Sequence, residues 1–187
     1  MGDNVLILDF GDTGNEAEAI RQSLEQFGYN VMKYGIGRPN DFIEILSGDS
    51  FADYKYLIIS CHGSNGDIVM PKLGESVYTG DEPKNDFSAD DILKYIKIEN
   101  KIIINTGCST GKSEKMKKAF VNNSNSYISP NDYLEATGTL FFVIGLFYYL
   151  IKTDLFKAFD LAMNIDKETQ SFNLATPQNT FFDSSIN

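Results

Sequence analysis

The chain has 187 residues, of which 42% are hydrophobic and 13% aromatic, and its formal net charge is −10. This hydrophobic content excludes a disordered chain, and the length suits a single α/β domain with a full core. The negative charge argues against nucleic acid and anionic membrane as main partners, because phosphate groups need lysine and arginine to neutralise them.

The cysteine content and the apolar runs indicate where the protein resides. Cys61 and Cys108 are too few for a disulfide framework, and we expect both to be free thiols in the reducing cytoplasm. The first residues, Met1 to Asn4, lack the basic region of a signal peptide. The longest apolar run, residues 140–151, is shorter than the roughly 20 residues that cross a bilayer. It therefore predicts a buried helix.

Short apolar runs alternate with helical patterns along most of the chain. The predicted strands cover residues 5–10, 29–34, 56–61, 101–105 and 126–129. The predicted helices begin near residues 17, 42, 88, 113, 137 and 155. This alternation predicts an α/β fold, in which a mostly parallel sheet has helices on both faces.

Turn residues and polarity indicate the structure of the remaining segments. Asn40 is the predicted N-cap of the second helix, and residues 67–80 predict a small hairpin or an irregular excursion. No linker divides the chain, so we expect one domain, residues 1–187, with a core of about residues 4–163. Residues 164–187 predict a polar, irregular tail that could dock through its phenylalanines. These are Phe172, Phe181 and Phe182.

The only histidine, His62, follows the third predicted strand, and Cys108 follows the fourth. If these strands are parallel neighbours, their ends place an imidazole beside a thiol, at the sheet edge where α/β proteins carry their sites. A nearby imidazolium and a helix N-terminus both favour the reactive thiolate. The N–H groups of Gly63 and Cys108 could then form an oxyanion hole for acyl transfer.

Two sequence blocks resemble a known group of enzymes. Ser60-Cys-His-Gly-Ser-Asn-Gly66 and Asn105-Thr-Gly-Cys-Ser-Thr-Gly111 are similar to the His-Gly and Cys blocks of caspase-like cysteine peptidases, which include caspases, metacaspases, gingipains, separase and bacterial CHAT-domain proteases. The separation of 46 residues between His62 and Cys108 is similar to the roughly 50 of caspases. Residues 127–142 resemble the CHAT segment in which a strand, a short acidic loop and an apolar helix follow the cysteine.

The resemblance covers about residues 4–163 and implies a caspase-like three-layer fold. It also implies a cysteine endopeptidase without a cofactor or metal, in which His62 is the general base and Cys108 the nucleophile. The Gly63 and Cys108 amides would form the oxyanion hole. The partners implied are a protein or peptide substrate and, because a domain this small can depend on another chain, a regulatory partner.

The chain departs from two members of this group around the cysteine. Thr106 and Gly107 stand where caspases carry Gln-Ala, so a caspase-type preference for aspartate is not expected. Metacaspases place an aspartate at the position of Thr106, in the pocket that takes a basic side chain. Asp132 is our predicted acidic residue for a substrate-specificity pocket, and its alternative role is that of a solvated turn residue.

Other functions remain open at this stage. The segment Gly11 to Glu16 resembles the loop that binds the FMN phosphate in flavodoxins, although Asp12 and Glu16 would repel a phosphate. The segment Gly107 to Ser113 resembles a P-loop but is one residue short of that motif. A third alternative is a non-catalytic interaction domain. Cys61 is predicted to be a core residue, and no metal-ligand spacing is present.

Overall fold

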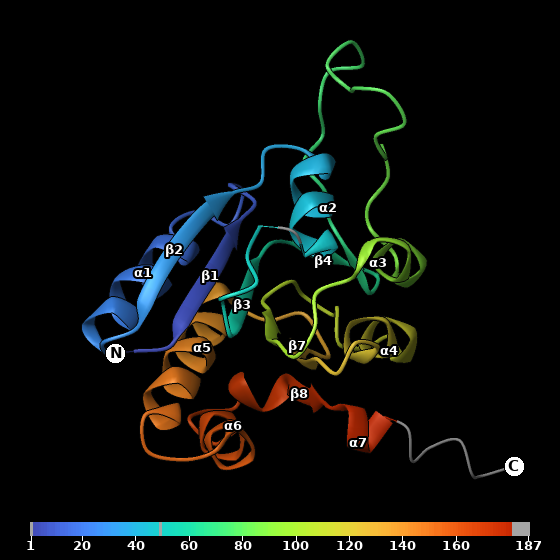
Figure 1. Cartoon of the computed structure of the whole chain (residues 1–187). Helices are drawn as coiled ribbons and strands as arrows, with labels where there is room; N and C mark the ends of the chain where they lie inside the picture. The colour runs from blue at the N-terminus through green and yellow to red at the C-terminus, as the bar shows by residue number, and fades with distance from the viewer. Residues whose placement is uncertain (1, 49, 181–187) are drawn as a thin grey trace, which may run out of the picture.

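Six strands form one mixed sheet in the order β2-β1-β3-β6-β7-β8 (Figure 1). The computed structural model describes residues 2–48 and 50–180. The strands of this sheet are β1 (Asn4–Asp9), β2 (Asn30–Gly35), β3 (Tyr56–Ser60), β6 (Ile102–Asn105), β7 (Ser126–Pro130) and β8 (Phe172–Ala175). The first five strands are parallel to their neighbours, and β8 is antiparallel to β7.

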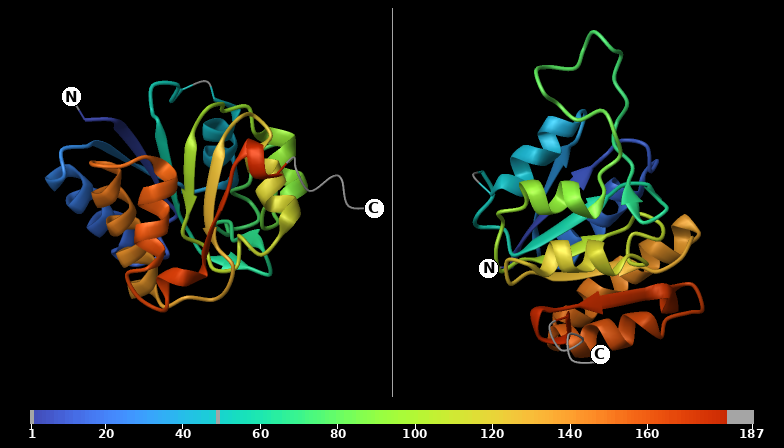
Figure 2. Two further views of the ribbon diagram at one scale, coloured as in Figure 1. Left: turned by 90° about the horizontal axis from the view of Figure 1, so that it is seen from below. Right: turned by 90° about the vertical axis from the view of Figure 1, so that its right-hand side faces the viewer.

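Helices cover both faces of the sheet (Figure 2). The helices are α1 (Glu16–Gln26), α2 (Pro39–Ser47), α3 (Ala89–Tyr95), α4 (Glu114–Val121), α5 (Ala136–Leu150), α6 (Leu155–Met163), η1 (Thr169–Ser171) and α7 (Pro177–Thr180). Buried residues of α1, α5 and α6 share one core cluster, whereas those of α2, α3 and α4 share the other. The predicted fold class, an α/β protein with a mostly parallel sheet between helical layers, is therefore confirmed.

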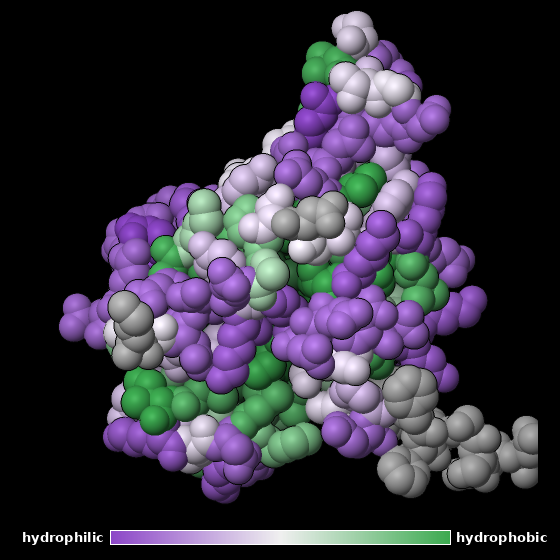
Figure 3. Space-filling view, viewed as in Figure 1, coloured by the Kyte–Doolittle hydropathy of each residue, from purple (hydrophilic) through white to green (hydrophobic). Residues whose placement is uncertain are grey.

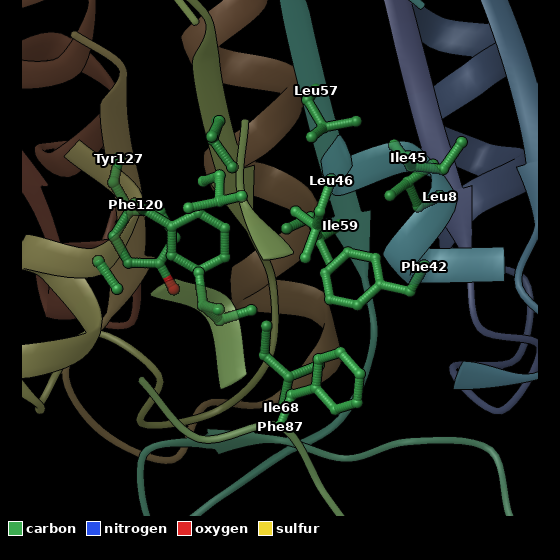
Figure 4. Packing of buried hydrophobic residues seen from close by; sticks show 14 of the residues in the cluster. Leu8, Phe42, Ile45, Leu46, Leu57, Ile59, Ile68, Phe87, Phe120 and Tyr127 are labelled. Carbon is green, nitrogen blue, oxygen red and sulfur yellow. The ribbon is translucent and has the colours of Figure 1, made fainter. Parts of the chain in front are cut away.

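Strand residues alternate between the two cores because successive side chains point to opposite faces of a sheet. In β1, Val5 packs into the cluster of α1 and α5, while Leu6 packs into the cluster of α2 and α3. Figure 4 shows the second cluster, where Ile59 of β3 lies beside Phe42 of α2 and Leu57 lies farther along the same strand. Burial on both faces explains why these strands appear in the sequence as continuous apolar runs.

The third and fourth strands of the sheet, β3 and β6, are parallel neighbours with Ile59 opposite Asn105. The segments that follow them, which contain His62 and Cys108, therefore leave the sheet side by side. The predicted site required these two strands to be parallel neighbours, and they are.

The start of α2 differs from the prediction. Asn40 is not the N-cap, because the helix begins at Pro39 and the extended residue before it, Arg38, occupies the cap position. The Asp41 carboxylate accepts hydrogen bonds from the N–H groups of Gly37 and Arg38. Pro39 fits the first helical position because its missing N–H would have no intrahelical partner there.

The prediction of an irregular tail after residue 163 was wrong for residues 169–180. The chain there forms η1, the edge strand β8 and α7. Phe172 docks as expected, since its ring stacks on Phe142 with the centroids 3.7 Å apart. Phe181 and Phe182 lie outside the described residues.

Between β3 and α3 the chain forms a small hairpin over residues 63–68 and then an irregular excursion. The excursion is one of the two alternatives predicted for residues 67–80, whereas the hairpin lies mostly before that segment. The hairpin strands are β4 (Gly63–Ser64) and β5 (Asp67–Ile68). The following loop protrudes from the body (Figure 1), and Figure 3 shows that its surface is mostly hydrophilic. At its base, Arg38 donates two hydrogen bonds to the buried carboxylate of Glu82, at 3.0 and 2.5 Å. This ion pair ties the loop to the start of α2.

The predicted apolar helix is α5, and none of its 15 residues is charged. Its inner side chains are buried, but Phe141 and Tyr148 are exposed, and Figure 3 shows hydrophobic residues over α5 and α6. Within the described residues, every helix is too short or too polar to span a membrane.

Candidate active site

His62 and Cys108 line one cavity of about 140 Å³ at the carboxyl ends of β1, β3 and β6. Its walls come from the loop after β1, from the ends of β3 and β6, and from the segment that leads into α5. The lining residues are Asp12, Thr13, Glu16, Cys61, His62, Thr106, Cys108, Leu134, Ala136 and Thr139. The structure therefore brings the sole histidine and Cys108 to the same site, as the strand pattern predicted, and the buried Cys61 also lines it.

His62 is held by the backbone of the first loop. Its Nε2 atom lies 3.1 Å from the carbonyl oxygen of Asp12. Because a carbonyl oxygen only accepts hydrogen bonds, Nε2 carries the hydrogen in this contact. In the neutral ring, Nδ1 is then the basic nitrogen. The Asp12 carbonyl is thus an orienting group for the imidazole, and the sequence contained no signal for it.

Cys108 is half-buried on a tightly tethered loop. Its Sγ atom lies 3.8 Å from the carbonyl oxygen of Leu134, which the thiol S–H can reach as a donor. The next residue, Ser109, has a φ of 57°, an unfavourable value for a residue with a side chain. Its N–H donates to the Asp132 carbonyl at 3.0 Å, and the Gly111 N–H donates to the Pro130 carbonyl at 2.8 Å. These bonds hold the strained loop against the end of β7.

Gly63 lies directly against the backbone of Cys108. A Cβ atom at Gly63 would collide with the carbonyl oxygen of Cys108 and would lie 2.9 Å from its nitrogen. The close approach therefore requires glycine. It brings together the two residues whose N–H groups were predicted to form an oxyanion hole.

Asp12 and Glu16 are the acidic residues that line the cavity, and Glu16 is the more buried of the two. Its carboxylate accepts hydrogen bonds from the hydroxyl groups of Ser60 and Thr106, both at 2.8 Å. Burial raises the pKa of Glu16 above its ordinary value of 4.5, and the two hydroxyl donors and the charge of His62 partly offset this rise. The sequence signal for Glu16 was its place at the start of the helix after β1, at the same sheet edge as His62.

Asp132 does not line this cavity. Its carboxylate accepts a hydrogen bond from the N–H of Tyr133 at 2.8 Å, and its side chain is exposed. Its backbone carbonyl supports the Cys108 loop through Ser109. The structure therefore places Glu16, rather than Asp132, beside the predicted dyad, while a substrate-binding role for Asp132 stays a prediction.

Cys61 is a core residue, as predicted. Its side chain packs with Leu57 and Ile59, and its thiol lies 3.4 Å from the Asn105 side-chain oxygen. Burial raises its pKa well above the ordinary value, and the charges of Glu16 and Asp12 add to the effect. A thiol in this environment stays protonated and is a poor nucleophile.

The two segments that resemble phosphate loops do not fit a phosphate. In the first, the Gly11 N–H donates to the Asp9 carboxylate, and the Glu16 carboxylate stands at the start of α1, where it would repel an anion. These residues therefore do not suit the FMN phosphate. In the second, a Cβ at Gly111 would meet the side chains of Ser129 and Asn173, so protein atoms fill the space that a phosphate would need.

Metal binding has no support in the described part of the chain. No group of three or more histidine, cysteine, aspartate or glutamate side chains there could hold a metal ion.

Comparisons with known proteins give a weak likeness. No protein-family model and no curated protein matches the chain. Among solved structures it is similar to a short-chain flavodoxin associated with a non-canonical PDU bacterial microcompartment (14% identity, 68% of this chain and 78% of that one, TM-score 0.36). It is also similar to the Streptococcus pneumonia TIGR4 flavodoxin (14% identity, 68% and 79%, TM-score 0.35). At these TM-scores the similarity assigns neither a family nor a function.

Proposed function

We propose that the protein is a cysteine endopeptidase of the caspase-like type, in which His62 and Cys108 act as a dyad. The observation that carries this proposal is their shared cavity at the carboxyl ends of adjacent parallel strands. The orienting carbonyl of Asp12 adds the third group that an activated nucleophile needs.

The proposed reaction follows from the placement of these groups. His62 takes the thiol proton of Cys108, and the thiolate attacks the substrate carbonyl carbon to form a C–S bond. The resulting oxyanion is stabilised by the N–H groups of Gly63 and Cys108. The intermediate collapses as the C–N bond breaks, and the leaving amine takes the proton from His62. A water molecule, deprotonated by His62, then hydrolyses the thioester and releases the acid and the Cys108 thiol.

Glu16 sets the substrate preference in this proposal. Its carboxylate lies in the cavity beside the dyad, where it would pair with a basic or hydrogen-bond-donating side chain next to the scissile bond. A cavity of about 140 Å³ accepts one such side chain and little more. The expected substrate is thus a peptide with lysine or arginine before the cut.

Peptide cleavage tests the proposal. A peptide library should be cut by the wild-type protein and not by Cys108→Ala, and lysine or arginine should be enriched before the cut. A thiol-reactive peptide inhibitor should label Cys108. Equal cleavage by both proteins, or labelling of Cys61 instead, would rule out this mechanism. Absence of any cleavage would favour a non-catalytic interaction domain.

A flavodoxin-like electron-transfer protein that binds FMN is the second candidate. The observation in its favour is the order of the five parallel strands, 2-1-3-4-5 along the sheet, which is that of flavodoxins. The carboxylate of Glu16 at the start of α1 counts against it. A yellow purified protein that absorbs near ~450 nm would support this function, and a colourless protein would exclude a resident flavin.

The half-buried thiol of Cys108 fits a reducing compartment, because the reaction needs it free. We therefore place the proposed activity in the cytoplasm.

A further inference from the structure

A second, larger cavity lies next to the candidate active site. This open groove has a volume of about 730 Å³, within the range of sites that bind small molecules or peptide side chains. It lies where β1 and β2 end and where the segment after β5 passes them. Its lining residues are Asp9, Phe10, Gly11, Asp12, Gly35, Ile36, Gly37, Val69, Met70, Pro71 and Lys72.

Residues of the groove contact the dyad on its histidine side. Asp12 lines both cavities, and its carbonyl accepts the hydrogen bond from His62. Val69, in the opposite wall, donates its N–H to the His62 carbonyl at 3.0 Å. His62 and Cys108 both line the smaller cavity and not the groove. The Cys108 thiol lies against the carbonyl of Leu134, which lines the smaller cavity, whereas two groove residues bond to His62. The groove therefore adjoins the histidine rather than the thiol.

This asymmetry assigns a direction to a bound peptide. In acyl transfer the histidine gives its proton to the leaving amine, so the leaving segment lies on the histidine side of the nucleophile. The acyl segment then occupies the smaller cavity that contains Cys108 and Glu16.

We propose that the groove binds the part of the substrate that follows the scissile bond and selects a bulky apolar side chain within its first two residues. This inference rests on the proposed peptidase function. The buried side chains of Phe10, Ile36 and Met70 form an apolar floor. The carboxylate of Asp9 is paired with Lys33 at 2.9 Å, so it does not present a free charge to the groove.

Gly35 offers a way to fill the groove. It is the last residue of β2, a Cβ built on it has no neighbour within 4 Å, and its φ is outside the left-handed region. The variant Gly35→Phe therefore adds a ring at the groove without a backbone penalty. The matched control is Met32→Phe, which places the same ring on the same strand at an exposed position outside the groove.

The first arm of the test measures binding without catalysis. A fluorescein-labelled hexapeptide with a free amino terminus and leucine first is titrated into the Cys108→Ala protein, and fluorescence anisotropy is recorded. We expect binding to weaken about tenfold when the leucine of the peptide is replaced by glycine. Gly35→Phe should weaken binding of the leucine peptide by about the same factor. Met32→Phe should leave it unchanged. The leucine-to-glycine comparison needs no variant of the groove, so it stands even if Gly35→Phe fails to fold.

The second arm measures cleavage by the protein with Cys108 intact. Gly35→Phe should lower kcat/KM for a peptide that continues past the cut about tenfold more than for a reporter that ends in a coumarin amide. The proposed role of the groove is overturned if Gly35→Phe lowers kcat/KM equally for the two substrates. It is also overturned if the measured affinity depends neither on the leucine nor on Gly35→Phe. Binding that depends on both, without any Cys108-dependent cleavage, overturns the peptidase function and leaves the groove as a peptide site.

Discussion

The two thiols of the chain follow adjacent strands of one sheet but lie in contrasting surroundings. Cys61 comes directly after β3 and keeps the inward direction of the strand, so it is buried among Leu57 and Ile59, although it also lines the cavity that contains His62. Cys108 comes three residues after β6, where the chain has already turned out of the sheet, and it is half-buried in the cavity with His62. The distance past the strand end, rather than the strand end itself, therefore decides whether a thiol is structural or available.

The largest expected difference between the two thiols is in catalysis. Cys108→Ala should lower kcat/KM at least about a thousandfold, because it removes the proposed nucleophile. Cys61→Ala should keep the activity of the wild type and lower the free energy of unfolding by about 1 kcal/mol, through lost packing. Kinetic assays and urea unfolding measure both effects. If Cys61→Ala were the inactive variant, Cys61 rather than Cys108 would be the nucleophile.

The next difference is in reactivity toward iodoacetamide. Cys108 should be alkylated in the native protein, whereas Cys61 should react only after unfolding, since burial keeps its thiol protonated and covered. The rate ratio should be about a thousandfold or more, set by the rarity of opening. Mass spectrometry of timed samples identifies the modified residue. Similar rates at both positions would show that Cys61 is accessible.

Gly63→Ala tests the backbone around the available thiol, Cys108. The added methyl group would push against the Cys108 backbone and displace the proposed oxyanion donors. We expect kcat to fall about a hundredfold, as for the loss of one such donor. Gly74→Ala is the control, because a Cβ there makes only an ordinary contact with Val77. Full activity of Gly63→Ala would remove Gly63 from the mechanism.

The smallest expected effect concerns the carboxylate of Glu16, which lines the same cavity as both thiols. Because the pKa of Glu16 is raised in the folded protein, the folded state binds more protons than the unfolded state above pH 4.5. The contribution of Glu16 to stability is therefore fully present below that pH and is lost as the pH rises through its folded pKa.

Glu16→Gln should remove this loss, because an amide does not ionise. Urea unfolding between about pH 4 and pH 8 compares it with the wild type and with Glu135→Gln, which alters an exposed carboxylate outside the cavity. If the free energy of unfolding changed with pH in the same way in the wild type and in Glu16→Gln, a raised pKa of Glu16 would be contradicted.

The sequence was sufficient to predict the parallel strands, the helical layers and the meeting of His62 with Cys108. Long apolar runs and the ends of parallel strands carry that information. It was insufficient for the contact between His62 and Asp12, since a backbone carbonyl leaves no trace in residue type. The place of Glu16 in the site was not predicted either, because its signal, an acid at the start of a helix, is common for electrostatic reasons alone.

The missed strand has a different cause. β8 has only four residues of mixed polarity and takes its apolar partner, Phe142, from a distant helix. Its pairing with β7 depends on the assembled fold, so no local sequence pattern predicts it.

The position of β8 also has a consequence for the order in which the protein becomes competent during its synthesis. Asn173 of β8 donates to the Ser129 carbonyl at 2.7 Å, and the Asn131 N–H donates to the Ser171 carbonyl at 2.8 Å. Through Gly111 and Pro130 the same turn of β7 holds the Cys108 loop. A nascent chain that has emerged from the ribosome only to residue 163 already contains every proposed catalytic group. It still lacks the last strand that braces the turn of β7, so the proposed site is completed only after β8 has emerged.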